Sequence, residues 1–510
     1  MPFRRSLCHV VCAGIVAVMP WSVGAQAPGS PAAQIQAGDA FMTAAQYRDA
    51  VVAYRSAKQT DDPGLRVRAT VGEIRALHRI AAYVDARVSG AAVAAASPTD
   101  PEALAVYGDA LWGSGLFIDA EELYARALAI NVTNARARHG RGRSLLARQR
   151  FDEALADLTY ATEADPGEAT YWCSLAHAYE RLRRYADAIA ALERYITLLP
   201  RNPDDPIVLA TRGQEQFLRS FRNRTPVDGI DAATTYEVPF RVVNRRIVVK
   251  GRLNGQAPID LVVDTGAERV ALTPAMARRA GVAVVGRLET AGVGELARGF
   301  RSMETGRLDQ LQIGALRVQH VPCIIKNPAL PLLPSPEGDV FSPLALGLSV
   351  RVDYRRQVLT MARRLSPESH DVTLPMRMTR LATVRGVING SSPAAFVVDT
   401  GGVATSVNLS VAARVTPTVE ARRVPIRVYG MAGLDRSAFL MPFVDIEFGP
   451  GAGVAKSSVV VLNLDAPSAL LGFQLGGIIG HEFLSRYRLS IDLERSHVGL
   501  RAEGENPQGR

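Results

Sequence analysis

Two segments of this chain, 135 positions apart, have closely similar sequences. VKGRLNGQAPIDLVVDTG occupies positions 249–266 and VRGVINGSSPAAFVVDTG occupies 384–401, and ten of the 18 aligned positions are identical without a gap. A lone Asp-Thr-Gly would be weak evidence, because roughly a tenth of chains of this length contain one by chance. Two copies in the same context indicate a duplication. We therefore predict two homologous lobes, over residues 236–365 and 372–503.

The residue pattern of both segments predicts β-strands. Apolar residues alternate with polar ones, and Asn254-Gly255 and Asn389-Gly390 are typical of two-residue hairpin turns. A second short apolar strand follows each Asp-Thr-Gly about 80 residues later. The C-terminal half is thus expected to be all-β.

The duplication also brings two carboxylates into equivalent positions, Asp264 and Asp399. Hydrolysis of an amide by water needs a base that takes a proton and an acid that gives one. Two neighbouring carboxylates can do both, because they cannot ionise together and share one proton as a pair. The less specific alternative is a pair of structural turns with capping aspartates.

The residues after each aspartate suit such a pair. If a pseudo-two-fold axis relates the two lobes, a threonine hydroxyl can form a hydrogen bond across it to the other lobe. A glycine allows the backbone to approach closely without a Cβ clash. These residues are Thr265 and Gly266 in the first lobe, and Thr400 and Gly401 in the second.

With these motifs, the two lobes resemble retropepsin-like aspartic proteases, fused in tandem as in pepsin-type enzymes. The family also has an apolar-apolar-Gly element that supports the catalytic loop. Ile478-Ile479-Gly480 fits it, whereas the first lobe has Ser342 in place of the glycine. The resemblance implies an aspartic-type endopeptidase acting on polypeptides, with Asp264 and Asp399 as catalytic residues and no metal or organic cofactor.

The resemblance further implies flaps, which are hairpins that close over the substrate and exclude water. Each lobe has a glycine-bearing candidate after its aspartate. We expect one at Gly292 and Gly294 and the other at Tyr429 and Gly430. Tyr429 is a candidate substrate contact, and a packed turn aromatic is the alternative.

Residues 30–222 have helical spacing with a period of 34. Tyr83, Phe117, Phe151 and Tyr185 follow one another at this interval, and each has an alanine three residues later. This region resembles the tetratricopeptide repeat, whose helix pairs stack into an all-α solenoid. Its concave side could bind a protein partner or a peptide, or the solenoid could be a scaffold packed on its own C-terminal half. Residues 223–235 are expected to be a linker.

The N-terminus predicts a secretory signal peptide over residues 1–25. Arg4 and Arg5 precede a short apolar run, small residues follow, and we expect cleavage near Ala25. The apolar run is too short for a membrane anchor, which needs about 20 residues. The expected location is periplasmic or secreted from a bacterium, with no membrane span.

Composition argues against several other classes. The net charge is +9, but no basic block with interleaved aromatics points to nucleic acid. Outside the predicted signal peptide only Cys173 and Cys323 remain, without a metal-binding spacing, and both are expected to be buried.

Three alternatives remain open from the sequence alone. The chain could be a non-catalytic peptide-binding protein on a protease fold, for which Ser342 is the support. Each lobe could pair with a lobe of another chain, although lobe pairing within a monomer is expected. The substrate could also be an amide other than an ordinary peptide.

Overall fold

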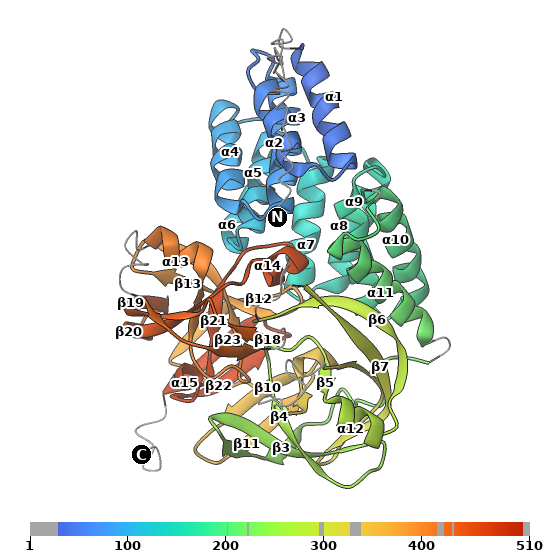
Figure 1. Ribbon diagram of the computed structural model, residues 1–510, viewed down its shortest axis with the longest axis vertical. Helices are drawn as coiled ribbons and strands as arrows, with labels where there is room; N and C mark the ends of the chain where they lie inside the picture. Colours follow the sequence, from blue (N-terminus) through green and yellow to red (C-terminus); the bar gives the residue numbers. More distant parts are fainter. Residues whose placement is uncertain are drawn as a thin grey trace, which may run out of the picture.

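The computed structural model describes residues 29–200, 202–221, 224–294, 300–326, 338–415, 423–430 and 433–502. The predicted signal peptide, with Ala25, lies outside these ranges. The chain forms a helical N-terminal region followed by two β lobes (Figure 1), which confirms the predicted fold class.

The helical region is a series of antiparallel pairs. Small residues set the spacing within it: a Cβ at Gly108 would lie 2.6 Å from the ring of Tyr124, so the helices of that pair approach closely. Asp62 and Asp100 cap helix N-termini directly before a proline, a typical start signal. The helices are α1 Pro31–Thr43, α2 Tyr47–Ala57, α3 Pro63–Arg79, α4 Tyr83–Ala96, α5 Pro101–Gly113, α6 Phe117–Ile130, α7 Ala135–Ala147, α8 Phe151–Ala164, α9 Ala169–Arg181, α10 Tyr185–Leu198 and α11 Pro206–Ser220.

The solenoid is curved enough for its early repeats to contact its late ones. Arg75 on α3 forms an ion pair of 3.1 Å with Glu168, the N-cap of α9. Arg79 on the same helix pairs with Asp205, the N-cap of α11. These cross-contacts occupy part of the concave side with the solenoid's own side chains.

Lobe 1 contains an eight-stranded sheet. Its strand order is β2-β3-β4-β9-β5-β8-β7-β6, and β4 runs parallel to β9. The turn at Asn254-Gly255 has φ values of 47° and 73°, as a two-residue hairpin requires. In sheet order the strands are Arg241–Val243, Arg246–Leu253, Ile259–Val263, Val340–Phe341, Val270–Leu272, Leu316–Ile325, Phe300–Ile313 and Ala283–Ala291.

A 13-stranded sheet contains lobe 2 and joins it to lobe 1. Its order is β1-β11-β10-β22-β23-β12-β13-β14-β21-β15-β20-β19-β16, and the antiparallel pair β10–β22 links the two lobes. Strand β14 runs parallel to β21, as β4 does to β9. In sheet order the strands are Tyr236–Pro239, Val358–Ala362, Ser349–Asp353, Tyr487–Asp492, His497–Ala502, Val372–Met378, Ala382–Ile388, Ser392–Val398, Leu475–Ile479, Ser406–Asn408, Ala452–Leu462, Phe439–Gly449 and Val424–Pro425.

The remaining elements are short. Strands β17 (Val428–Gly430) and β18 (Gly433–Asp435) form a separate hairpin. The short helices are α12 Pro274–Arg279, η1 Leu344–Leu346, α13 Leu409–Val415, α14 Asp465–Leu471 and α15 His481–Leu484.

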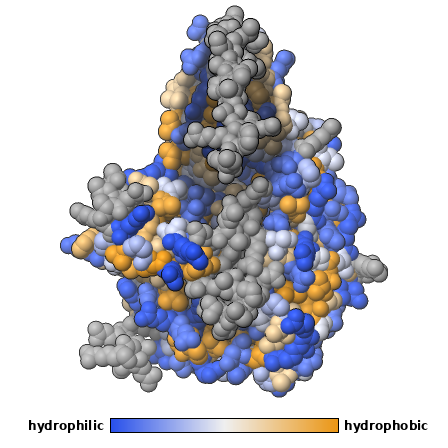
Figure 2. All heavy atoms as spheres, viewed as in Figure 1, coloured by the Kyte–Doolittle hydropathy of each residue, from blue (hydrophilic) through white to orange (hydrophobic). Residues whose placement is uncertain are grey.

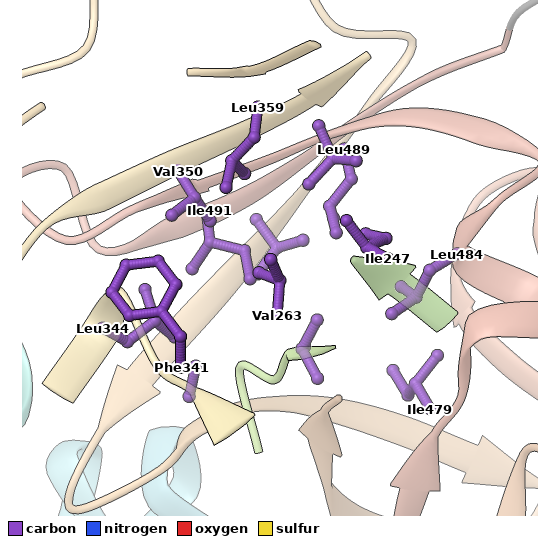
Figure 3. Packing of buried hydrophobic residues seen from close by; sticks show 14 of the residues in the cluster. Ile247, Val263, Phe341, Leu344, Val350, Leu359, Ile479, Leu484, Leu489 and Ile491 are labelled. Carbon is purple, nitrogen blue, oxygen red and sulfur yellow. The ribbon is translucent and has the colours of Figure 1, made fainter. Parts of the chain in front are cut away.

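One continuous apolar core runs through both lobes. Val263 and Ile479, which lie at the ends of β4 and β21, are both buried in it (Figure 3). Leu489 and Ile491 on the linking strand β22 pack in the same cluster. The core shared between the lobes therefore fixes the end of β4, which carries the first Asp-Thr-Gly loop. It also fixes the end of β21, the parallel neighbour of the strand β14 that carries the second loop.

The solenoid is packed on lobe 2. Phe117 at the start of α6 contacts Phe473 with ring centroids 4.9 Å apart, inside a second apolar cluster built from both regions. The Gln474 N–H donates to the Gly113 carbonyl at 2.7 Å. Arg377 on β12 forms a buried ion pair of 2.6 Å with Glu121 on α6. The scaffold interpretation of the solenoid thus has direct structural support.

Surface hydropathy, helix length and the two cysteines describe what kind of protein this is. The face in Figure 2 mixes hydrophilic and hydrophobic residues, and exposed large apolar side chains occur in both regions, such as Val88 on α4 and Phe443 on β19. Within the described ranges, no helix is both long and apolar enough to span a membrane. Cys323 is buried and Cys173 partly buried, and both thiols are free.

Candidate active site

Both aspartates lie directly after a buried strand. Asp264 follows β4 and Asp399 follows β14, and their N–H groups donate to the carbonyls of Phe341 (3.0 Å) and Ile479 (3.1 Å). These carbonyls belong to the parallel neighbours β9 and β21. The two loops therefore leave their lobes in the same way.

The two loops are joined by a reciprocal set of hydrogen bonds, which we call the threonine pair. The Thr265 hydroxyl donates to the Val398 carbonyl at 2.6 Å, and the Thr400 hydroxyl donates to the Val263 carbonyl at 2.8 Å. Each hydroxyl also accepts the backbone N–H of the other threonine, at 3.2 and 3.1 Å. Thr265 is 1% exposed and Thr400 is 0% exposed, so the two lobes are tied to each other in the dry interior.

The glycines bring each carboxyl group against the opposite loop. A Cβ at Gly266 would lie 2.5 Å from Asp399 Cγ, and a Cβ at Gly401 would lie 2.4 Å from Asp264 Cγ. Each carboxylate also accepts the N–H of the glycine two positions later, at 2.8 Å in lobe 1 and 2.7 Å in lobe 2. Only glycine fits here, and both carboxyl groups lie where the loops meet, each partly exposed.

The support of the two loops differs between the lobes. At Gly480 a Cβ would come within 2.5 Å of the Ala404 backbone, and the next residue, His481, donates its N–H to the Gly402 carbonyl at 2.7 Å. In lobe 1 the equivalent positions are Ser342 and Pro343. Ser342 is 0% exposed, and among the described residues nothing forms a hydrogen bond with its hydroxyl. Proline has no N–H to donate.

Three charged residues near the two aspartates, Asp264 and Asp399, were not predicted from the sequence to belong to the site. Glu268 and Arg269 end the lobe 1 loop, and Arg380 in the β12–β13 turn binds Glu268 across the lobes at 2.8 Å. Their place within five residues of Asp264 was the signal that could have singled out the first two.

The two flap candidates meet each other. Gly292 and Gly294 follow β6, and Gly430 ends β17. A Cβ at Gly430 would lie 2.4 Å from the Val293 carbonyl oxygen, so the hairpins of the two lobes are in backbone contact. Tyr429 pairs with Leu434 in the β17–β18 ladder, and its side chain lies outside the described part of the chain.

Among the described residues, no group of three or more His, Cys, Asp or Glu side chains could hold a metal ion. The arrangement at the loop junction is instead a pair of carboxyl groups with backbone donors. Such a pair can give and take a proton on either side of a bound amide.

Comparison with known proteins identifies both regions. A family described as aspartyl protease matches residues 249–350, which contain Asp264, and the tetratricopeptide repeat family matches residues 139–206. A TPR repeat-containing thioredoxin of Arabidopsis thaliana is 29% identical over 154 residues, which are 29% of this chain and 22% of that protein. The chain therefore spans less than a quarter of this relative's length.

Solved structures of repeat proteins are similar to part of the chain. A thermophilic TPR protein of Thermus thermophilus is 18% identical, covering 38% of this chain and all of that one, with a TM-score of 0.30. A MamA structure from Desulfovibrio magneticus is 20% identical, covering 31% of this chain and 85% of that one, with a TM-score of 0.23. YrrB, described as a TPR protein with an unusual peptide-binding site, is 21% identical, covering 35% of this chain and 90% of that one, with a TM-score of 0.21.

Proposed function

We propose that this chain, in which N-terminal tetratricopeptide repeats precede a C-terminal aspartyl protease domain, is an exported aspartic endopeptidase. Asp264 and Asp399 are its catalytic residues. The proposal rests above all on the threonine pair, because it ties together the two loops whose glycines each face the opposite carboxyl group.

The proposed reaction is direct attack of water on a peptide carbonyl. The ionised carboxylate takes a proton from water as the water oxygen bonds to the carbonyl carbon. The protonated carboxyl group donates a hydrogen bond to the carbonyl oxygen. The tetrahedral intermediate then collapses, and the leaving nitrogen receives a proton from the pair. Partial exposure of Asp264 and Asp399 supports this proposal, because water and substrate must reach both.

We assign the flap role to the contacting hairpins at Gly292 and Gly430, with Gly294 and Tyr429 beside them. Two hairpins that meet over a substrate would exclude bulk water, and hydrogen bonds and charges act more strongly in such a site. Opening of the contact between Val293 and Gly430 would then precede substrate entry.

For the solenoid we propose that it positions a polypeptide or a protein partner for the protease domain. Its repeats are of a kind that binds proteins. The cross-contacts of Arg75 and Arg79 take up part of the concave side, so we favour binding at α9 around His177, whose side chain is exposed.

One observation favours a second candidate, a peptide-binding protein that does not cut. The buried Ser342 hydroxyl has no hydrogen-bond partner among the described residues, so the support of the lobe 1 loop departs from that of lobe 2. An inactive relative would tolerate such a departure. We rank it second, because nothing in a binding role requires both aspartates.

The proposal also includes export. A cleaved signal peptide over residues 1–25 would deliver the mature chain to a bacterial periplasm or the exterior. Edman sequencing of the mature protein from a bacterial host tests this, with a start just after Ala25 as the expected result.

A peptide-library digest tests the enzymatic proposal. The mature chain is incubated with the library from acid to neutral pH, and products are identified by mass spectrometry. Asp399→Asn should abolish the cleavages that the wild type makes. Absence of cleavage by the wild type, with peptide binding retained, would favour the binding protein instead.

A further inference from the structure

The lobe 1 loop between β4 and β5 is six residues long and is held largely from outside its own lobe. Thr265 binds the Val398 carbonyl of lobe 2, and Glu268 binds Arg380 of lobe 2. The loop's last residue, Arg269, instead contacts the solenoid. Its guanidinium donates to the Gln214 side-chain carbonyl on α11 and lies 4.5 Å from the centroid of the Phe217 ring.

Both the oxygen and the nitrogen of the Gln214 side-chain amide form hydrogen bonds. Its oxygen accepts from Arg269, and its nitrogen donates to Glu180 on α9 at 2.8 Å. Phe217, one turn further along α11, is 3% exposed and packs edge-on against Phe221 at 5.0 Å. The Arg269 side chain therefore meets a preformed surface on the solenoid.

The same helix also lies on the flap strand of lobe 1. A Cβ at Gly213 would come within 2.6 Å of the Arg287 carbonyl oxygen and 2.7 Å of Leu288 Cβ, both on β6. Figure 1 shows α11 alongside β6. One solenoid helix thus contacts both the catalytic loop of lobe 1 and the strand β6 that leads to its flap.

The corresponding loop of lobe 2 is supported by hydrogen bonds from within its own lobe. There the N–H groups of His481 and Glu482, at the start of α15, donate to the carbonyls of Gly402 and Val403 at 2.7 and 3.0 Å. In lobe 1 the position of His481 is taken by Pro343, which has no N–H. The lobe 1 loop thus has less support from its own lobe, and the same loop is contacted by the solenoid through Arg269.

We propose that Gln214 is a positioning residue, which holds the lobe 1 catalytic loop through Arg269 and makes the last repeat helix part of the catalytic unit. This inference rests on the proposed function. The solenoid is then required for catalysis by the protease domain and is more than a tether for partners.

The test uses the full mature chain and Gln214→Met, which keeps the side-chain length and removes both hydrogen bonds. Arg212→Ala, an exposed change on the same helix, is the control. We expect Gln214→Met to lower kcat on a cleaved peptide by about ten- to a hundredfold, the size of a small misplacement at a reacting centre. KM should change far less. Arg212→Ala should leave both unchanged.

A double substitution and a second readout distinguish positioning from general damage. If Gln214 acts through Arg269, the variant Gln214→Met/Arg269→Met should lose no more activity than Arg269→Met alone. Backbone hydrogen exchange over residues 261–272 should accelerate in Gln214→Met, with the circular dichroism spectrum unchanged. Normal kcat, additive losses, or a loss of kcat without faster exchange would each overturn the inference. A wild type that cleaves nothing would refute the proposed function, while the exchange measurement would still decide the contact.

Discussion

Three buried threonines offer a graded test of how the lobes are joined. Thr400, Thr383 and Thr305 are each 0–1% exposed, so a change to valine conserves shape and removes only the hydroxyl. They differ in the hydrogen bonds that are lost. The Thr400 hydroxyl makes two across the lobes, the Thr383 hydroxyl makes one within lobe 2 to the Arg377 carbonyl, and the Thr305 hydroxyl makes none with described residues.

The expected cost follows the number of buried groups that are left without a partner. Each such group costs about 1–3 kcal/mol. Thr400→Val strands the Val263 carbonyl and the Thr265 N–H, which sums to about 2–6 kcal/mol. Thr383→Val strands one carbonyl, which costs about 1–3 kcal/mol. Thr305→Val should be neutral or stabilising, because it removes a hydroxyl that is buried without compensation.

Urea unfolding of the full chain measures this series. Trp112, in the apolar cluster shared by the solenoid and lobe 2, provides a fluorescence signal for the packed state. The midpoint should fall most for Thr400→Val, less for Thr383→Val, and not at all for Thr305→Val. Equal midpoints for Thr400→Val and Thr305→Val would refute the reasoning that the threonine pair joins the lobes.

Three further predictions concern the dyad glycines, the solenoid interface and pH. Gly401→Ala, with its Cβ 2.4 Å from the opposite carboxyl carbon, should abolish peptide cleavage, while Gly338→Ala, whose nearest contact is 3.7 Å, should retain it. Arg377→Met removes a buried cation and leaves Glu121 paired only with Arg148 among the described residues, so it should lower the urea midpoint. Arg385→Met breaks an exposed pair worth about 0–1 kcal/mol and should lower the midpoint less; equal effects would contradict the buried interface. Burial lowers the pKa of His481 from 6.5 to about 4, so its neutral form stabilises the fold above pH 6.5, and this contribution falls as the pH drops toward 4. His481→Phe should therefore remove about 3 kcal/mol of acid destabilisation from unfolding curves between pH 6.5 and 4, and an unchanged pH dependence would exclude this cause.

The architecture could be predicted from the sequence because its signals repeat. The period of 34 marked the helix pairs, and the duplicated 18-residue segment placed Asp264 and Asp399 in equivalent loops. The hairpin turns followed from Asn-Gly, since both residues must adopt positive φ. Each of these signals is local or recurs at a fixed interval, so a single sequence is enough to find it.

The interface between the regions could not be predicted in this way. The pair Arg377–Glu121 joins residues 256 positions apart, and Arg269 and Gln214 lie 55 apart. An isolated arginine and a glutamine carry no periodicity that links them, so only the fold reveals such contacts. Ser342 was visible in the sequence as a departure from the family pattern. The sequence did not show that helix α11 contacts the lobe 1 loop beside it through Gln214 and Arg269.

The most direct test of the central claim, that one chain holds a complete two-aspartate site, is a complementation experiment. Asp264→Asn and Asp399→Asn chains are coexpressed, copurified and assayed on a peptide that the wild type cleaves. If both aspartates of a site come from one chain, each variant alone and the mixture are inactive. If lobes of different chains pair, half of the sites in a mixed dimer contain Asp264 from one chain and Asp399 from the other. Cleavage by the mixture, or by either variant alone, would contradict the account.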